Sequence, residues 1–118
     1  MKHLPTILQR QAHGDCLELS FDLGPDCAWF DGHFPGQAIL PGVVQIGWAA
    51  HFAAQMLACD EPPLVLDRVK FKHPLGPGAQ LTLRLQRLGN KVNYDYWLAT
   101  ASDPISASSG TLDFSSTT

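Results

Sequence analysis

Residues 43–59 restrict the fold most, because they read VVQIGWAAHFAAQMLAC and contain no Asp, Glu, Lys or Arg. Alanine, leucine and methionine favour helix, and the segment is too long for an ordinary strand. A helix that is apolar on nearly all sides belongs in the interior of a protein. Pro41 and Gly42 lie where its first turn would start, and residues 60–63 (DEPP) would stop it. The sequence therefore predicts one buried helix over about 43–59.

Alternation of apolar and polar residues predicts strands before and after this helix. The segments with a strand pattern are residues 6–11, 16–23, 64–72, 80–88, 91–100 and 105–114. Gly89-Asn90 would join two of them as a hairpin. Antiparallel strands with one buried helix make an α+β fold in which the sheet wraps around the helix.

Composition narrows the class of protein. The chain has 118 residues without a repeat or a linker, and we expect a single domain, residues 1–118. A net charge of −3 gives no reason to expect nucleic acid as a partner. We see neither a signal peptide nor an apolar stretch long enough to span a membrane. The three cysteines have no CxxC spacing, so we expect a cytoplasmic protein without a disulfide framework or a metal site.

The loop before the helix carries the candidate chemistry. Residues 31–42 read DGHFPGQAILPG, in which His33 precedes one Pro-Gly step and a second step, Pro41-Gly42, leads into the helix. An isolated loop histidine would be ordinary. A histidine held between two rigid steps in front of a buried helix favours a constructed site.

These residues resemble the signature of the β-hydroxyacyl-acyl-carrier-protein dehydratases, which are hotdog-fold enzymes of fatty acid synthesis. The resemblance is carried by residues 33–36 (HFPG) and 40–43 (LPGV), and residues 69–74 (VKFKHP) with 77–78 (PG) are similar to the family's next strand and turn. It covers about residues 28–114.

A narrower resemblance comes from residues 29–33 (WFDGH) and 41–46 (PGVVQI), which are similar to the small thioester dehydratases encoded with aryl-polyene clusters. The resemblance implies a hotdog fold and the conversion of a 3-hydroxyacyl thioester into a trans-2-enoyl thioester, in fatty acid or polyene-type biosynthesis. It implies no cofactor, since the acyl group is carried on the phosphopantetheine of acyl carrier protein or on coenzyme A. It also implies a homodimer, or a heterodimer with another hotdog protein, with each site built from both protomers.

The implied reaction needs a base for the C2 proton, donors for the thioester oxygen and an acid for the departing hydroxyl. A histidine side chain ordinarily titrates near neutral pH, so His33 suits the role of base. The backbone N–H of Gly42, at the helix N-terminus, suits an oxygen that gains negative charge, and glycine permits close approach. Pro35 and Pro41 would stiffen the loop that holds these two groups in register.

The chain departs from the family pattern on the second turn of the helix. The resemblance implies an acidic residue where this sequence has Gly47, and His51 stands where the family commonly has glutamine. Residues 47, 51 and 55 share one helical face. We hypothesise that Gly47 opens space and that His51 acts there as an acid or holds a water. A hydrogen-bonded core histidine is the equal alternative, and Asp31 is a second candidate for the acid, although an exposed loop aspartate explains it more simply.

Aromatic residues near the motif offer an apolar path for a chain. Trp29, Phe30, Phe34 and Trp48 would line either the core or a tunnel for the acyl group.

Three cations, Arg68, Lys70 and Lys72, fall on one face of a predicted strand by the period of two. A solvated strand edge is the simpler explanation. The functional alternative is a docking site for the phosphopantetheine phosphate and for an acidic carrier protein.

Two other functions stay open. A hotdog thioesterase would need a carboxylate to activate water, and the predicted helix has none. A non-catalytic acyl-thioester-binding subunit, paired with a sister hotdog protein, agrees with the missing acid. His33 near Gly42 argues against that subunit, because a binder needs no base.

Overall fold

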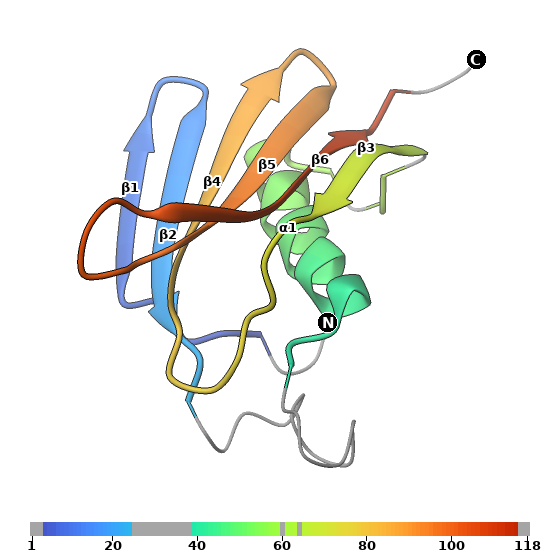
Figure 1. Ribbon diagram of the computed structural model, residues 1–118. Coiled ribbons are helices and arrows are strands. Elements are labelled where there is room, and N and C mark those ends of the chain that lie inside the picture. Colours follow the sequence, from blue (N-terminus) through green and yellow to red (C-terminus); the bar gives the residue numbers. More distant parts are fainter. Residues whose placement is uncertain (1–3, 25–38, 60, 64, 116–118) are drawn as a thin grey trace.

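The computed structural model describes residues 4–24, 39–59, 61–63 and 65–115. Its elements are β1 (Gln9–His13), β2 (Cys16–Asp22), α1 (Gly42–Met56), β3 (Val65–Phe71), β4 (Gln80–Leu88), β5 (Lys91–Leu98) and β6 (Ile105–Asp113). The strands form one sheet in the order β1-β2-β4-β5-β6-β3, and every neighbouring pair is antiparallel. Figure 1 shows α1 against one face of this sheet, with β1 and β3 at its two edges. The predicted α+β architecture is confirmed.

The predicted hairpin is formed by β4 and β5. Leu88 pairs with Lys91, so Gly89 and Asn90 make the turn, and Gly89 has a φ of 64° that glycine adopts without a steric penalty. The alternating leucines of β4 are buried beneath α1. The alternating buried residues of β5 include its two tyrosines. At the N-terminus the first strand begins at Gln9, later than predicted. Within the described residues, no helix has the length and apolar character needed to cross a membrane.

Helix α1 ends at Met56, earlier than the predicted Cys59. The stop is a backbone motif: the amide of Cys59 donates to the carbonyl of Ala54, the amide of Ala58 donates to that of Gln55, and Ala58 adopts a φ of 49°. This is a Schellman motif with alanine at the position that usually holds glycine. The chain therefore leaves the helix before it reaches the prolines at 62 and 63.

Burial of α1 is complete on one face only. Its buried residues, which face the sheet, are Val44, Gln45, Trp48, Ala49, Phe52 and Ala53. Val43 on the other side is 76% exposed, and Gly47 and His51 are half-buried. One sheet covers only one side of a helix, so a second apolar side of α1 remains accessible in the single chain.

Strand β3 is an edge strand with a bulge. Asp67 pairs with Thr111 and Lys70 with Ser109, so that Arg68 and Val69 both face Gly110 of β6. Arg68 has a φ of 56°, as one residue of such a bulge must bend away from the ladder.

Candidate active site

Several residues of the motif lie outside the described residues: His33, Phe34 and Pro35, together with Asp31 and the aromatic residues at 29 and 30. The structure does describe the start of the helix, the stripe of residues 47, 51 and 55, and the cations of β3.

The start of α1 presents amide donors. The carbonyl of Pro41 accepts the amides of Val44 and Gln45, at 3.1 and 3.2 Å. The amides of Gly42 and Val43 donate to no acceptor among the described residues. First-turn amides of a helix have no partner within the helix, and they point to where the helix dipole is positive. This geometry suits a ligand oxygen that carries negative charge.

Gln45 fixes this helix start to the sheet. Its side-chain amide donates to the carbonyl of Leu40 at 3.2 Å, its Oε1 accepts the hydroxyl of Ser108 at 2.7 Å, and its backbone carbonyl accepts the hydroxyl of Tyr96 at 2.6 Å. Among the described residues, Gln45 and Ser108 are the polar side chains that are buried in the core. Sequence reasoning missed this group, although an amide side chain on the buried face of an otherwise apolar helix is a usable signal.

A cavity of about 420 Å³ opens beside the helix start. Its walls include Gly42, Gln45, Phe71, Lys72 and His73. A methyl group on Gly42 would lie 2.6 Å from Cζ of Phe71, so a side chain at this position would have to displace the half-exposed ring. Nδ1 of His73 lies 2.8 Å from the carbonyl oxygen of Pro74 and donates to it. Phe71 and His73 had no assigned role in the sequence analysis.

A second cavity, of about 520 Å³, lies along the open side of α1. Gly47, His51 and Gln55 line it together, and Glu61 is another of its lining residues. The Gln55 amide donates to Nε2 of His51 at 3.2 Å, so the imidazole nitrogen acts as an acceptor in this arrangement. Sequence reasoning sought a carboxylate on the helix and did not consider Glu61, which follows the helix.

Trp48 lies elsewhere. Its ring is 1% exposed and meets Phe21 of β2 edge to face, with ring centroids 5.7 Å apart. The residue therefore packs between helix and sheet and does not line either of these two cavities.

Arg68, Lys70 and Lys72 come together along a groove on the sheet. Burial raises the pKa of the nearby Asp95 carboxyl above its ordinary value, and the positive charges of Lys72 and Arg84 oppose that rise. Within the described parts of the chain, no three His, Cys, Asp or Glu side chains gather as metal ligands would.

Comparison with known proteins identifies the family of this chain. Residues 9–111 match the family model described as ApeI-like, ApeI dehydratase. The chain belongs to the ApeI-like dehydratase family. One solved structure, the dehydratase heterocomplex ApeI:P from Xenorhabdus doucetiae, is 33% identical with a TM-score of 0.81, over 92% of this chain and 96% of that chain.

Another solved structure, of an uncharacterized protein from Erwinia carotovora subsp. atroseptica, is also 33% identical, with a TM-score of 0.80 over 93% of this chain and 94% of that one. These likenesses confirm the predicted hotdog fold of this ApeI-like chain. Among curated proteins, the 3-hydroxyacyl-[acyl-carrier-protein] dehydratase FabZ of Gluconacetobacter diazotrophicus is 32% identical over 73 residues. That match covers 54% of this chain and 45% of the relative, so the chain spans about half the length of the curated relatives it matches.

Proposed function

We propose that this protein removes water from a 3-hydroxyacyl thioester and yields the trans-2-enoyl thioester. The observation that carries the proposal is the start of α1, where Gly42 lines a cavity, the Gly42 and Val43 amides have no acceptor among the described residues, and Gln45 ties the helix start to the sheet. In this reaction His33 takes the C2 proton, the C3–O bond breaks, and the hydroxyl leaves as water once it is protonated. The Gly42 amide stabilises the negative charge on the thioester oxygen.

The acid for the departing hydroxyl is a separate question, because the helix has Gly47 in place of a carboxylate. Two side chains of the 520 Å³ cavity are candidates: His51, through its imidazole, and Glu61, through its carboxyl group. A carboxyl group from a partner subunit is the third. Gly47 has no side chain, so the cavity beside it leaves space for any of these three groups.

Pairing with a second hotdog subunit is the next part of the proposal. Val43 on α1 and Val65, Leu66 and Phe71 on the edge strand β3 are large apolar side chains that the single chain leaves exposed. An unpaired, apolar edge strand is a template for another strand. The partner is a second copy of the chain or a sister hotdog protein, and the heterocomplex formed by the ApeI:P relative supports the latter kind.

The acyl group would arrive on the phosphopantetheine of an acyl carrier protein, or on coenzyme A, in the cytoplasm. FabZ relatives are named for substrates on acyl carrier protein, which supports the first carrier. We assign no further cofactor, since acid–base chemistry at His33 and the amides of the helix start supply the needed groups.

A single assay tests the reaction. The purified chain is incubated with a 3-hydroxyacyl carrier protein, and the acyl mass is followed with His33→Ala and His13→Ala variants beside it. Loss of water that disappears in His33→Ala and persists in His13→Ala supports the dehydratase. Release of free acid would indicate a thioesterase instead.

An unchanged acyl mass would favour the second candidate function, a non-catalytic acyl-binding subunit. The absence of a carboxylate at Gly47 also favours this candidate. The assay is then repeated with the partner protein that copurifies from the native source. Activity that needs both chains and still depends on His33 retains the dehydratase, whereas activity that survives His33→Ala assigns the chemistry to the partner.

A further inference from the structure

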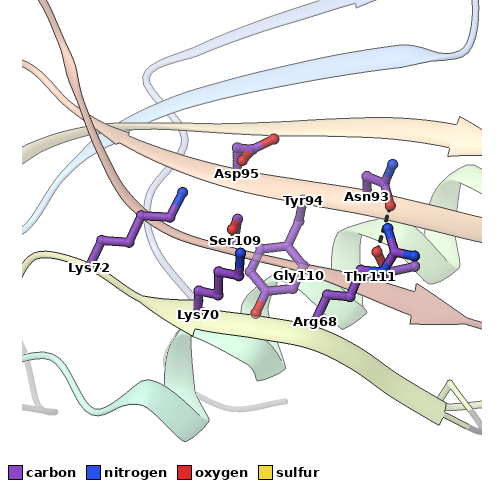
Figure 2. Close-up of a pocket in the computed structure, with 9 residues that line it drawn as sticks. All are labelled: Arg68, Lys70, Lys72, Asn93, Tyr94, Asp95, Ser109, Gly110 and Thr111. Atoms are coloured by element: carbon purple, nitrogen blue, oxygen red, sulfur yellow. Dashed lines mark hydrogen bonds between the residues drawn. The ribbon is translucent and has the colours of Figure 1, made fainter.

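Phe71, the last residue of β3, lies against the start of α1. Its neighbours Lys70 and Lys72 extend from the other side of the chain (Figure 2). Successive side chains of a strand point to opposite faces of the sheet, which turns Phe71 toward the helix. A methyl group built on Gly42 would lie 2.6, 2.9 and 3.1 Å from Cζ, Cε1 and Cε2 of Phe71. The tip of the ring therefore occupies the space that a side chain at residue 42 would fill.

The backbone that carries this ring is fixed to the sheet. Phe71 pairs with Ser108 of β6, and the Ser108 hydroxyl donates to the side chain of Gln45 in the first turn of α1. The two amides that follow Phe71 in the chain both donate to the carbonyl of Ala107, at 2.8 and 3.1 Å. The ring and the helix start are thus held by the same strand, so the ring leaves Gly42 mainly by rotation of its own side chain.

Phe71 and Gly42 together form part of the wall of the cavity of about 420 Å³. The ring is 54% exposed, so the part away from Gly42 stays open to solvent or to a partner strand. A thioester oxygen that accepts the Gly42 amide would lie about 3 Å from its nitrogen. The thioester carbon and C2 follow within two bonds of that oxygen, which brings C2 within contact distance of the ring tip.

The shape of the reacting group makes this contact selective. When C2 loses its proton, the electron pair is shared with the thioester oxygen and the group becomes planar. C2 then has two in-plane positions, one beside the oxygen and one beside the sulfur. In an unbranched substrate C3 takes one position and hydrogen the other, so hydrogen can lie beside the oxygen, against the ring. A 2-methyl substrate has carbon at both positions, and no choice of conformation keeps carbon away from the ring.

We propose that Phe71 determines specificity for thioesters that carry no substituent at C2. This inference rests on the proposed dehydratase function, because the ring acts on a substrate whose oxygen is bound at Gly42. One methyl group in a defined pocket changes discrimination by about 10–200-fold. Rotation of the half-exposed ring relieves part of the clash, so we expect a preference of about tenfold, at the lower end of this range.

The test measures kcat/KM for loss of water from two substrates on the same acyl carrier protein, 3-hydroxybutyryl and 2-methyl-3-hydroxybutyryl, the latter as separate C2 epimers. The native protein, with its partner subunit where the reaction needs one, should prefer the unbranched substrate by about tenfold over the better epimer. Phe71→Ala should reduce this ratio to about threefold or less, and Phe71→Leu should fall between the two. The effect of the methyl group on C2 acidity is common to all variants, so the change in the ratio isolates the ring.

Ile105→Ala is the matched control, because Ile105 in β6 is an apolar side chain of similar exposure, 41%, that lines none of the cavities described above. It should keep the native ratio, and circular dichroism should show that every variant is folded. An unchanged ratio in Phe71→Ala, or an equal change in Ile105→Ala, overturns the role of Phe71. Absence of water loss from both substrates, with the native protein and its partner present, would instead overturn the dehydratase function and the specificity inference with it.

Discussion

Ser108 in β6 donates a hydrogen bond of 2.7 Å to the side-chain oxygen of Gln45 in the first turn of α1. Tyr96 in β5 donates a second one, of 2.6 Å, to the backbone carbonyl of the same residue. Two strands of the sheet therefore hold the helix at the turn that lines the cavity. A site that depends on the position of backbone amides benefits from such rigid support.

Replacement of Gln45 by leucine should lower the free energy of unfolding by about 2–3 kcal/mol, because the buried Ser108 hydroxyl and Leu40 carbonyl lose their partner. Urea unfolding measures the change. Gln55→Leu is the matched control, since that glutamine is exposed on the same helix. Equal losses in both variants would show that the buried network contributes nothing specific.

Replacement of Gly42 by alanine should destabilise the fold by about 1 kcal/mol, since the new methyl group meets the ring of Phe71 and the half-exposed ring must shift. Phe71 is 54% exposed, so Phe71→Ala alone should cost less. Because the second change removes the clash, the double variant should be more stable than the sum of the two single effects predicts. Thermal unfolding of all four proteins closes this cycle, and strict additivity would rule out the steric explanation.

The edge strand gives a prediction about assembly. Leu66→Lys places a charge among the exposed apolar residues of β3 and should shift the protein, alone or with its partner, toward single chains. Leu88→Lys at the end of β4 is the control, because that side chain is 56% exposed, similar to the 47% of Leu66, and lies away from β3. Sedimentation velocity reports the mass. A chain that is monomeric under all conditions, with and without the partner, would contradict the proposed pairing.

The end of α1 leaves room for stabilisation. Ala58 adopts a φ of 49°, which lies in the left-handed helical region of backbone conformation. This conformation costs a residue with a side chain about 1 kcal/mol relative to glycine. Ala58→Gly should therefore raise the free energy of unfolding by up to about 1 kcal/mol. Ala54→Gly, inside the helix, should lower it by about 0.5–1 kcal/mol. Chemical denaturation of the two variants compares them directly, and a loss at both positions would contradict the capping motif.

Alkaline pH should reveal the buried tyrosines. Burial, together with the charge of Asp95, raises the pKa of Tyr94 from 10.0 to about 12, and burial raises that of Tyr96 well above 10.0. The folded state holds these protons more tightly than the unfolded chain. Their contribution to stability is thus full below pH 10 and falls as the pH rises toward about 12. Near-ultraviolet absorbance should show no tyrosinate at pH 10, where half-ionised tyrosines would contradict their burial.

Local patterns in the sequence determined most of the fold. Alternation placed the strands, Gly89-Asn90 placed the hairpin turn, and the uncharged segment placed the helix, because strand and helix periods are properties of neighbouring residues. The HFPG and PG steps also indicated the family. The end of the helix was misplaced, since the chain turns at Ala58 through backbone hydrogen bonds that no residue type announces.

Tertiary structure decided which residues meet. Phe71 and His73 line the same cavity as Gly42, although they are far from it in the sequence. Ser108 and Tyr96 donate hydrogen bonds to Gln45. Glu61 lines the same cavity as His51. A bulge in β3 places two of its residues opposite Gly110 of β6. Such contacts follow from the register between strands and the seating of the helix, which are long-range properties of the packed chain. The sequence by itself determined the elements and the family, and packing determined the walls of each cavity.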